Sequence, residues 1–191
     1  MKAALFFILC VCTAFASGES KPEAAVRSRL EALLEKEPAN VPALIGLGEI
    51  EYRARHLDEA EKLLRRATLA QPKSAPAWLA LGVVTCDMGK LNASMAALAQ
   101  AVWLEPGNAK AHSYLGVTLG RKGWRDGAEA EFQRALELDE SLADVHFNLA
   151  VVYLQENPPL LELARRHYYR ARDLGAAPDS LVEKQINGSK E

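Results

Sequence analysis

Apolar residues recur at steps of three and four along most of the chain, a spacing that places them on one face of an α-helix. In residues 23–36 the apolar stripe consists of Val26, Leu30, Leu33 and Leu34, and Pro38 ends the segment. The same spacing continues in segments separated by Pro, Gly, Asn or Asp. It predicts helices at 41–55, 58–70, 76–88, 91–104, 109–122, 125–138, from about 143, and at 159–174, with a short last helix through Ile186. The pattern therefore predicts an all-α chain.

The predicted helices come in pairs that repeat every 34 residues. One column of this period holds only small residues, namely Gly48, Gly82, Gly116 and Ala150. Glycine inside a helix costs about 1 kcal/mol relative to alanine, so we expect two helices to approach closely at this column. A second column, between the helices of a pair, holds Arg55, Gly89, Gly123 and Asn157. Gly and Asn readily take the left-handed conformation after a helix, and Arg55 departs from that pattern.

A fixed period of this length is typical of a stacked helical array. We place the repeats at about 41–74, 75–108, 109–142 and 143–177. Asp58 is expected to cap the second helix of the first repeat. Residues 23–36 align with a second helix and form a half repeat at one end, while the short last helix covers the other end. These segments predict one repeat domain over 23–187, after a flexible lead at 17–22 and before a disordered tail at 188–191.

The residues that recur in these columns resemble the tetratricopeptide repeat family. The second repeat carries Trp78, Leu81, Gly82, Ala101 and Pro106. The first and third repeats match at Leu47, Gly48, Ala60, Ala67 and Pro72, and at Leu115, Gly116, Ala128, Phe132 and Ala135. Glu51, Thr85 and Leu119 depart from the family's tyrosine column, which Tyr153 keeps. The resemblance implies a right-handed superhelical solenoid of antiparallel helix pairs, about four repeats long, with an N-terminal half repeat and a short C-terminal capping helix.

The family resemblance also implies a concave face, lined by the first helix of each pair, that holds a peptide or a partner segment. Mapped onto this sequence, the partner-binding candidates are Ile45, Glu49, Tyr52, Arg53, Leu79, Val83, Cys86, Tyr114, Val117, Arg121, Phe147, Asn148 and Val151. Some family members hold a carboxylate there with Lys, Asn and Arg, but Ile45, Glu49, Leu79 and Val83 stand at those positions. The lining favours an apolar or amphipathic segment with aromatic anchors.

Two interpretations are open for these side chains. Val83, Val117 and Val151 can simply pack between adjacent first helices. For Tyr52, Tyr114 and Phe147 we favour exposure in the groove.

The first residues have the layout of a secretory signal peptide. Lys2 precedes an almost wholly apolar run at 3–11, and Ala14-Phe15-Ala16 is a small-x-small cleavage signature. We expect cleavage after Ala16 and a secreted or periplasmic protein. The alternatives are an uncleaved membrane anchor, a misjudged start, or a lipoprotein attached at Cys10 or Cys12, where the preceding Leu9 and Val11 are large for that processing.

Composition and charge exclude several classes of function. Hydrophobic residues make up 49% of the chain and its formal charge is -2, which argues against disorder and nucleic-acid binding. Cleavage leaves Cys86 as the sole cysteine, so no internal disulfide is expected. His112 and His146 share a repeat column without further ligands nearby, and His56 and His167 stand alone, so we expect no metal, no cofactor and no catalytic site. Glu59 and Glu61 are interpreted as solvated.

These observations lead to three hypotheses of function. The first is a non-catalytic, exported protein–protein interaction module that scaffolds an assembly. The second is a structural subunit that self-associates through the stack ends or the basic last long helix, which carries Arg165, Arg166, His167, Arg170 and Arg172. The third is an accessory subunit whose partner carries the activity. The sequence does not identify the partner.

Overall fold

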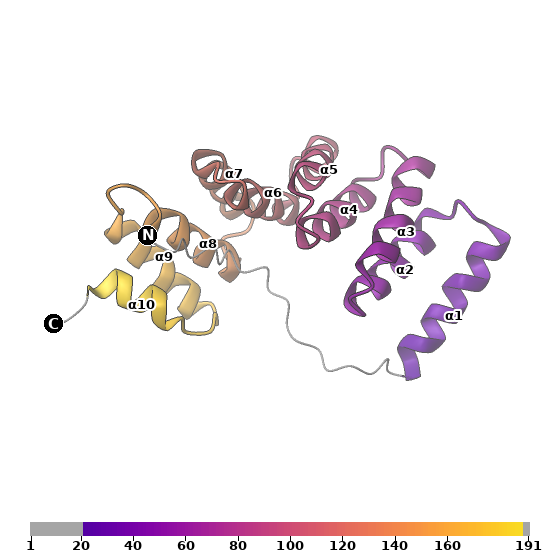
Figure 1. Cartoon of the computed structure of the whole chain (residues 1–191), viewed down its shortest axis with the longest axis horizontal. Coiled ribbons are helices and arrows are strands. Elements are labelled where there is room, and N and C mark those ends of the chain that lie inside the picture. Colours follow the sequence, from indigo (N-terminus) through magenta and orange to yellow (C-terminus); the bar gives the residue numbers. More distant parts are fainter. Residues whose placement is uncertain (1–20, 189–191) are drawn as a thin grey trace. The chain divides into compact units, whose positions relative to one another are not determined.

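The computed structural model describes residues 21–188, and these residues form ten helices and no strand (Figure 1). They divide into two compact units, an N-terminal unit of residues 21–106 and a C-terminal unit of residues 107–188. The N-terminal unit contains α1 (Lys21–Lys36), α2 (Val41–Arg53), α3 (Leu57–Ala70), α4 (Ala75–Asp87) and α5 (Leu91–Leu104). The C-terminal unit contains α6 (Ala109–Arg121), α7 (Arg125–Leu138), α8 (Ala143–Leu154), α9 (Leu161–Asp173) and α10 (Ser180–Asn187).

Each unit is built from helix pairs, as the 34-residue period predicts. In the N-terminal unit α2 pairs with α3 and α4 with α5, while α3 packs on α4. The predicted half repeat is α1, which lies against α2 with Leu30 and Leu34 on the core around Leu44 and Leu63. In the C-terminal unit α6 pairs with α7 and α8 with α9, and α10 packs on α8 and α9. Val182 and Ile186 are the buried residues of α10, which covers the last pair as expected.

The small-residue column marks close contacts between the two helices of a pair, which confirms the prediction. A Cβ added to Gly48 would lie 2.9 Å from Leu64 Cγ, and one added to Gly82 would lie 2.5 Å from Leu98 Cγ. At Gly116 the nearest atom would be Phe132 Cδ1, at 2.7 Å. Because real Cβ atoms do not approach other carbon atoms this closely, the second helix takes the space that a side chain would need.

In the column between the helices of a pair, the backbone conformation does not follow the residue type. Gly89 and Gly123 have φ values of 74° and 81°, and Arg55, the residue that departs from the pattern, has φ 64° as well. The prediction that Asn157 ends a helix in the left-handed conformation is wrong, since Arg55 alone among the described non-glycine residues has positive φ. Asn157 instead precedes a cis peptide bond to Pro158.

The starts of the first helices are capped by side chains in another column of the repeat, which sequence reasoning missed. Asn40 Oδ1 accepts from the Ala43 amide at 3.0 Å, and Asn108 Oδ1 accepts from the Ala111 amide at 3.1 Å. Ser74 stands midway between them and caps α4 in the same manner. The predicted cap at Asp58 is wrong: α3 begins at Leu57 after His56, without a side-chain cap, and Asp58 lies in its first turn.

Three predicted boundaries shift by two residues. Helix α2 ends at Arg53 instead of residue 55. Helix α1 begins at Lys21 instead of residue 23, and α9 begins at Leu161 instead of residue 159. The predicted signal peptide, most of the lead and the tail from residue 189 lie outside the described residues. Within 21–188, the helices are all too short or too polar to serve as membrane spans.

Candidate partner-binding faces

In the N-terminal unit the candidate residues lie on α2 and α4, the first helices of their pairs. Ile45, Leu79 and Val83 are half-buried, so each presents apolar surface while part of it packs on the core. Glu49 and Arg53 are exposed beside them on α2. This combination, called here the α2–α4 face, offers a strip of apolar side chains with charges at its edge.

Three hydrogen bonds hold the polar side chains at the edge of the α2–α4 face in place. The Tyr52 hydroxyl donates to Asp87 Oδ2 at 2.7 Å, which ties α2 to the end of α4. Arg53 donates from Nη2 and Nε to Glu23 Oε1 of α1, at 2.9 and 3.2 Å. Asp87 was missed by sequence reasoning, although it stands in the same 34-residue column as Arg53 and Arg121. Tyr52 is half-buried, and its hydroxyl already donates a hydrogen bond within the chain.

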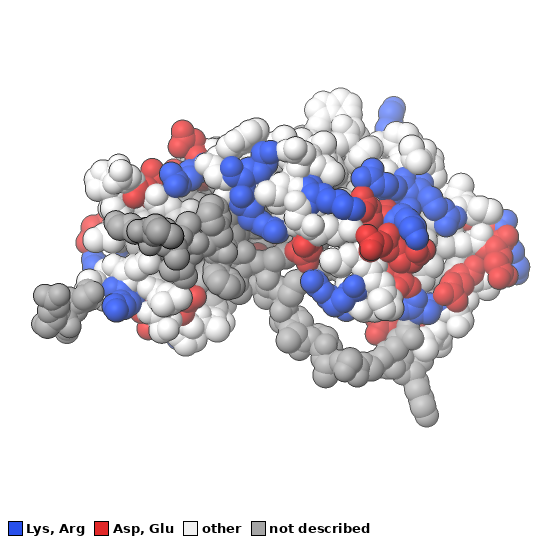
Figure 2. All heavy atoms as spheres, in the orientation of Figure 1, with Lys and Arg blue, Asp and Glu red and all other residues white. Residues whose placement is uncertain are grey.

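Charges inside the N-terminal unit hold its helices together. Burial by itself raises the pKa of Glu51, but hydrogen bonds from His56 and Arg27 outweigh it and keep that pKa below its ordinary value. The hydrogen bond from Lys90 Nζ, at 2.5 Å, is the largest cause of the lowered pKa of Glu61, and Arg65 adds a second. The interpretation of Glu61 as solvated is therefore wrong. Figure 2 shows acidic and basic side chains mingled over α1, α2 and α3.

The C-terminal unit places its candidates on α6 and α8, where most are covered. Val117 and Val151 are buried, so the packing interpretation describes them, whereas Val83 in the other unit is half-buried. Phe147 is only 7% exposed and its ring lies 6.3 Å from that of Tyr168, centroid to centroid. The expectation that Phe147 is exposed is wrong, because α9 supplies an aromatic partner that the repeat pattern does not reveal. Tyr114 and Arg121 are half-buried, and Cys86 of α4 is buried.

Asn148 is the unusual member of this set. Its side chain is 1% exposed, and neither Nδ2 nor Oδ1 has a hydrogen-bond partner among residues 21–188. A buried amide without partners costs about 1–3 kcal/mol of stability, and such groups are rare in folded proteins. The amide can donate one hydrogen bond and accept another, which is what a peptide group also does.

Comparison with known proteins agrees with this architecture. Residues 16–82 match the model of the tetratricopeptide repeat family. Residues 16–82 are therefore similar to tetratricopeptide repeats, and the described helices share the fold of solved TPR proteins. No curated protein sequence matches it significantly. The family and the fold are those of protein–protein interaction modules.

Solved structures share the fold at low sequence identity. MamA from Desulfovibrio magneticus RS-1 is 19% identical with a TM-score of 0.71, over 83% of this chain and 88% of that one. YrrB, a TPR protein with an unusual peptide-binding site, is 23% identical with a TM-score of 0.68, over 86% and 82% of the two chains. TTC0263, a thermophilic TPR protein of Thermus thermophilus, is 22% identical with a TM-score of 0.67, over 86% and 88%. These identities establish likeness of fold alone.

The histidines of the chain make contacts with other side chains of the chain. His112 Nδ1 lies 2.7 Å from Glu131 Oε2, and His56 Nδ1 lies 2.8 Å from Glu51 Oε2. His146 Nδ1 lies 3.0 Å from His167 Nδ1, so the prediction that His56 and His167 stand alone is wrong. Over the described range, no three His, Cys, Asp or Glu side chains come together as a metal site.

The pair of His146 and His167 has a defined proton arrangement. His146 Nε2 lies 3.3 Å from the Glu140 carbonyl oxygen, which can only accept, so Nε2 carries the proton. His146 Nδ1 then accepts from His167 Nδ1. Burial lowers the pKa of His167 to about 4, and the neighbouring His146 and Arg166 act in the same direction.

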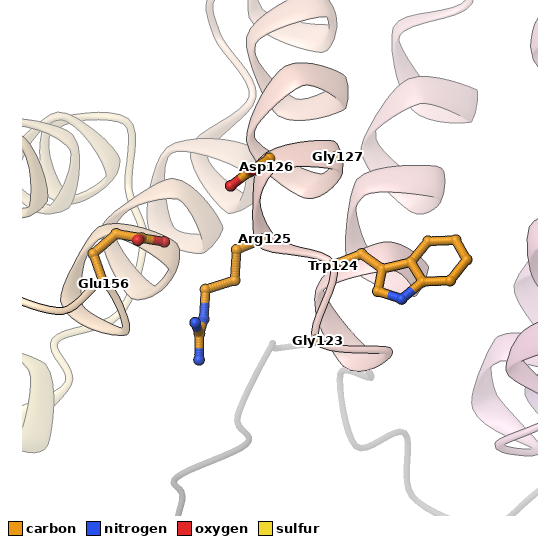
Figure 3. A pocket seen from close by; sticks show the side chains of 6 residues that line it. All are labelled: Gly123, Trp124, Arg125, Asp126, Gly127 and Glu156. Carbon is orange, nitrogen blue, oxygen red and sulfur yellow. The ribbon is translucent and has the colours of Figure 1, made fainter.

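An open hollow of about 280 Å³ lies at the start of α7 (Figure 3). Arg125, Asp126 and Glu156 supply its polar side chains, while the Trp124 ring points away from Glu156. The lining contains two carboxylates and a guanidinium, but no hydroxyl, thiol or imidazole that could act as a nucleophile.

The basic side chains of α9 are partly used to hold the end of the C-terminal unit. Arg165 donates to Glu162 Oε1 and to the Ile186 carbonyl oxygen, both at 2.6 Å. Arg172 donates to the Ala176 carbonyl oxygen. These contacts connect α9 with α10 and with the loop between them. Arg165 and Arg172 therefore help to stabilise the C-terminal unit.

Proposed function

We propose that this protein is a non-catalytic scaffold or assembly factor that holds an apolar or amphipathic segment of a partner protein. The observation that carries the proposal is the α2–α4 face, where half-buried Ile45, Leu79 and Val83 form an apolar strip. Arg53 and Glu23 form an ion pair at its edge. A segment with one apolar side and one charged side matches such a strip, because apolar contact supplies most of the affinity and charges set the orientation.

The test measures binding of defined peptides to the purified full chain. Peptides are selected from a random library on the protein, and their affinities are measured by isothermal titration calorimetry. We expect apolar or amphipathic sequences that bind with a negative heat-capacity change, the mark of apolar burial. The double variant Leu79→Asn/Val83→Asn should weaken binding about tenfold or more, as expected for loss of two central apolar contacts.

The matched control is Leu69→Asn, the same kind of change on the outer helix α3. Its affinity for the selected peptides should equal that of the unaltered chain, and circular dichroism should show unchanged helix content in all variants. Selected peptides that bind equally well to the Leu79→Asn/Val83→Asn variant would show that the α2–α4 face is not the binding surface.

In the C-terminal unit we propose that Asn148 pairs with the backbone of a bound segment that displaces the side chains now covering it. The unpartnered amide supports this role, because a partner's peptide group would satisfy both of its polar atoms. Asn148→Leu should raise the free energy of unfolding of the free protein by about 1–2 kcal/mol, since the desolvation penalty disappears. The same variant should bind segments that engage this unit less tightly. If Asn148→Leu is more stable but binds the segments with unchanged affinity, Asn148 has no part in binding.

We also propose that the protein is exported and acts outside the cytoplasm, in the periplasm or beyond the cell. This proposal rests on Lys2, the apolar run at 3–11 and the Ala14-Phe15-Ala16 signature. Intact-mass measurement on protein purified from fractionated cells tests it. The expected mass lacks residues 1–16, and a full-length mass in the cytoplasmic fraction would contradict export.

A further inference from the structure

Helix α5 differs from every other outer helix of the repeats in having no charge. The outer helix is the second of each pair, and α3, α7 and α9 contain six Asp, Glu, Lys or Arg residues each. The 14 residues Leu91–Leu104 of α5 contain none. Outer helices normally face water and carry charges on that side. In Figure 2 the protruding part of the surface over α5 is white, with charged side chains to its flanks.

The exposed residues of α5 form one continuous line. Asn92, Ala96, Ala99 and Trp103 are exposed at steps of four, three and four, which puts them on the same helix face. The Trp103 side chain is 72% exposed. Leu69 occupies the equivalent place 34 residues earlier on α3 and is 80% exposed. These two are the most exposed large apolar residues of the described chain, and both belong to the N-terminal unit.

We propose that α5, flanked by α3, is a surface through which two copies of this chain pair about a two-fold axis. In this arrangement the axis lies in the plane of contact and crosses the helices at right angles, so α5 runs antiparallel to α5 of the second copy and α3 antiparallel to α3. The small side chains Ala96 and Ala99 then let the two α5 backbones approach, and Trp103 of each copy covers the start of the opposite helix. A surface without charge meets its own copy without like-charge repulsion.

Charge complementarity along α3 supports a second copy as the occupant. The first turn of α3 carries Asp58 and Glu59, and its later turns carry Arg65 and Arg66. In the antiparallel arrangement the acidic end of one α3 faces the basic end of the other, and the axis makes this match twice. An anionic membrane fits less well, because acidic headgroups would attract Arg65 and Arg66 but repel Asp58, Glu59 and Glu105, so the mixed charges give no net attraction.

The size of the surface sets the strength of the pairing. Helices α3 and α5 have 14 residues each, so each is about 21 Å long. The outer sides of the two helices, each about 10 Å wide, cover roughly 400 Å² per copy, or about 800 Å² in total, which is below the range of stable dimers. The dimer is therefore weak and depends on protein concentration. It uses no residue of the α2–α4 face and does not rest on the proposed peptide binding.

Sedimentation velocity of the full chain, from about 2 to 200 μM to span a weak dimer, tests the proposal. The average mass should rise with concentration from that of one copy towards twice that value. Trp103→Gln should weaken the association about tenfold or more. The matched control is Trp124→Gln, which alters another Trp that is 53% exposed and should leave association unchanged. Both positions are on the surface, so both variants are expected to fold.

Charge reversal tests the antiparallel geometry. Glu59→Arg or Arg66→Glu alone should weaken the dimer, and the two changes together should restore it because acid and base exchange places. Three results would overturn the proposal. The first is a protein that stays monomeric at every concentration, whether or not it binds anionic vesicles. The others are association that survives Trp103→Gln, or a double variant that associates as weakly as the single variants.

Discussion

Replacing Gly82 by alanine tests the close approach of α4 and α5 directly. Alanine normally stabilises a helix interior relative to glycine by about 1 kcal/mol. At Gly82, however, the new Cβ would lie 2.5 Å from Leu98 Cγ, 2.8 Å from its Cδ2 and 3.3 Å from its backbone nitrogen. Leu98 is fully buried, so its side chain has no free space into which it could turn.

The expected magnitude follows from these distances. Carbon atoms in contact normally stand about 3.5–4.0 Å apart, so α5 has to move by about 1 Å. Overpacking of this kind costs about 1–3 kcal/mol, which exceeds the gain in helix propensity. We therefore expect Gly82→Ala to lower the free energy of unfolding by about 1–2 kcal/mol.

Urea unfolding followed by circular dichroism at 222 nm measures this change. With a slope of about 1–3 kcal/mol per molar urea, the midpoint should fall by roughly 0.5–1 M. The matched control is Gly127→Ala in α7, whose added Cβ would lie at an ordinary 3.4 Å from Leu119 Cδ1. That variant should gain up to about 1 kcal/mol, so the same substitution should have opposite signs at the two positions.

A double-mutant cycle with Leu98→Ala separates the clash from other effects. Leu98→Ala alone should cost about 2–5 kcal/mol, and it should remove the penalty of Gly82→Ala because the two groups no longer compete for space. A coupling of about 1–2 kcal/mol is expected. A higher urea midpoint for Gly82→Ala, or a penalty that persists beside Leu98→Ala, would refute the reasoning.

Three further predictions concern the turns, the caps and the pH dependence. Gly89 has φ 74° and open space around its Cβ position, so Gly89→Ala should cost about 1–2 kcal/mol in urea unfolding from backbone strain alone; an unchanged midpoint would contradict this. Asp179 Oδ1 accepts from the Leu181 and Val182 amides, so Asp179→Ala should cost about 1 kcal/mol and speed hydrogen exchange in α10, whereas uniform exchange would contradict a local cap. The unfolded chain binds a proton at His167 near the ordinary pKa of 6.5, but the folded chain binds it only near pH 4. The free energy of unfolding should therefore fall by about 2 kcal/mol, allowing for partial exposure, as the pH drops from 7 to 4. His167→Gln should flatten that decline, and an equally steep decline in the variant would contradict the assignment.

Periodicity alone located nearly every helix, because burial on one face imposes the same spacing whatever the neighbours are. The small-residue column could also be predicted to mark a contact, since glycine in the middle of a helix is unfavourable without one. Arg55 shows the limit of such reasoning. Its residue type argues against a left-handed conformation, yet the turn between α2 and α3 imposes the same φ there as at Gly89.

The candidate faces could be predicted only in outline. The repeat register places Ile45, Leu79 and Phe147 on first helices, but register does not determine which neighbour covers a side chain. Tyr168 packs on Phe147 from another helix, and the contact between His146 and His167 joins residues 21 positions apart. Asn148 reads as an ordinary polar position along the chain, and its unpartnered amide is visible only once its surroundings are known.

By itself, then, the amino-acid order determined the all-α class and the 34-residue pairing, because both follow from the spacing of residues along the chain. The residues that recur in the repeat columns carried the family resemblance. The tertiary structure decided what depends on contacts between distant segments: which first-helix side chains are exposed, which histidines meet, and which amide is left unpaired. It also distinguished the exposed Trp103 on the uncharged helix α5 from apolar residues that pack inside. The physical reason is that burial and electrostatics depend on neighbours in space, which local periodicity does not specify.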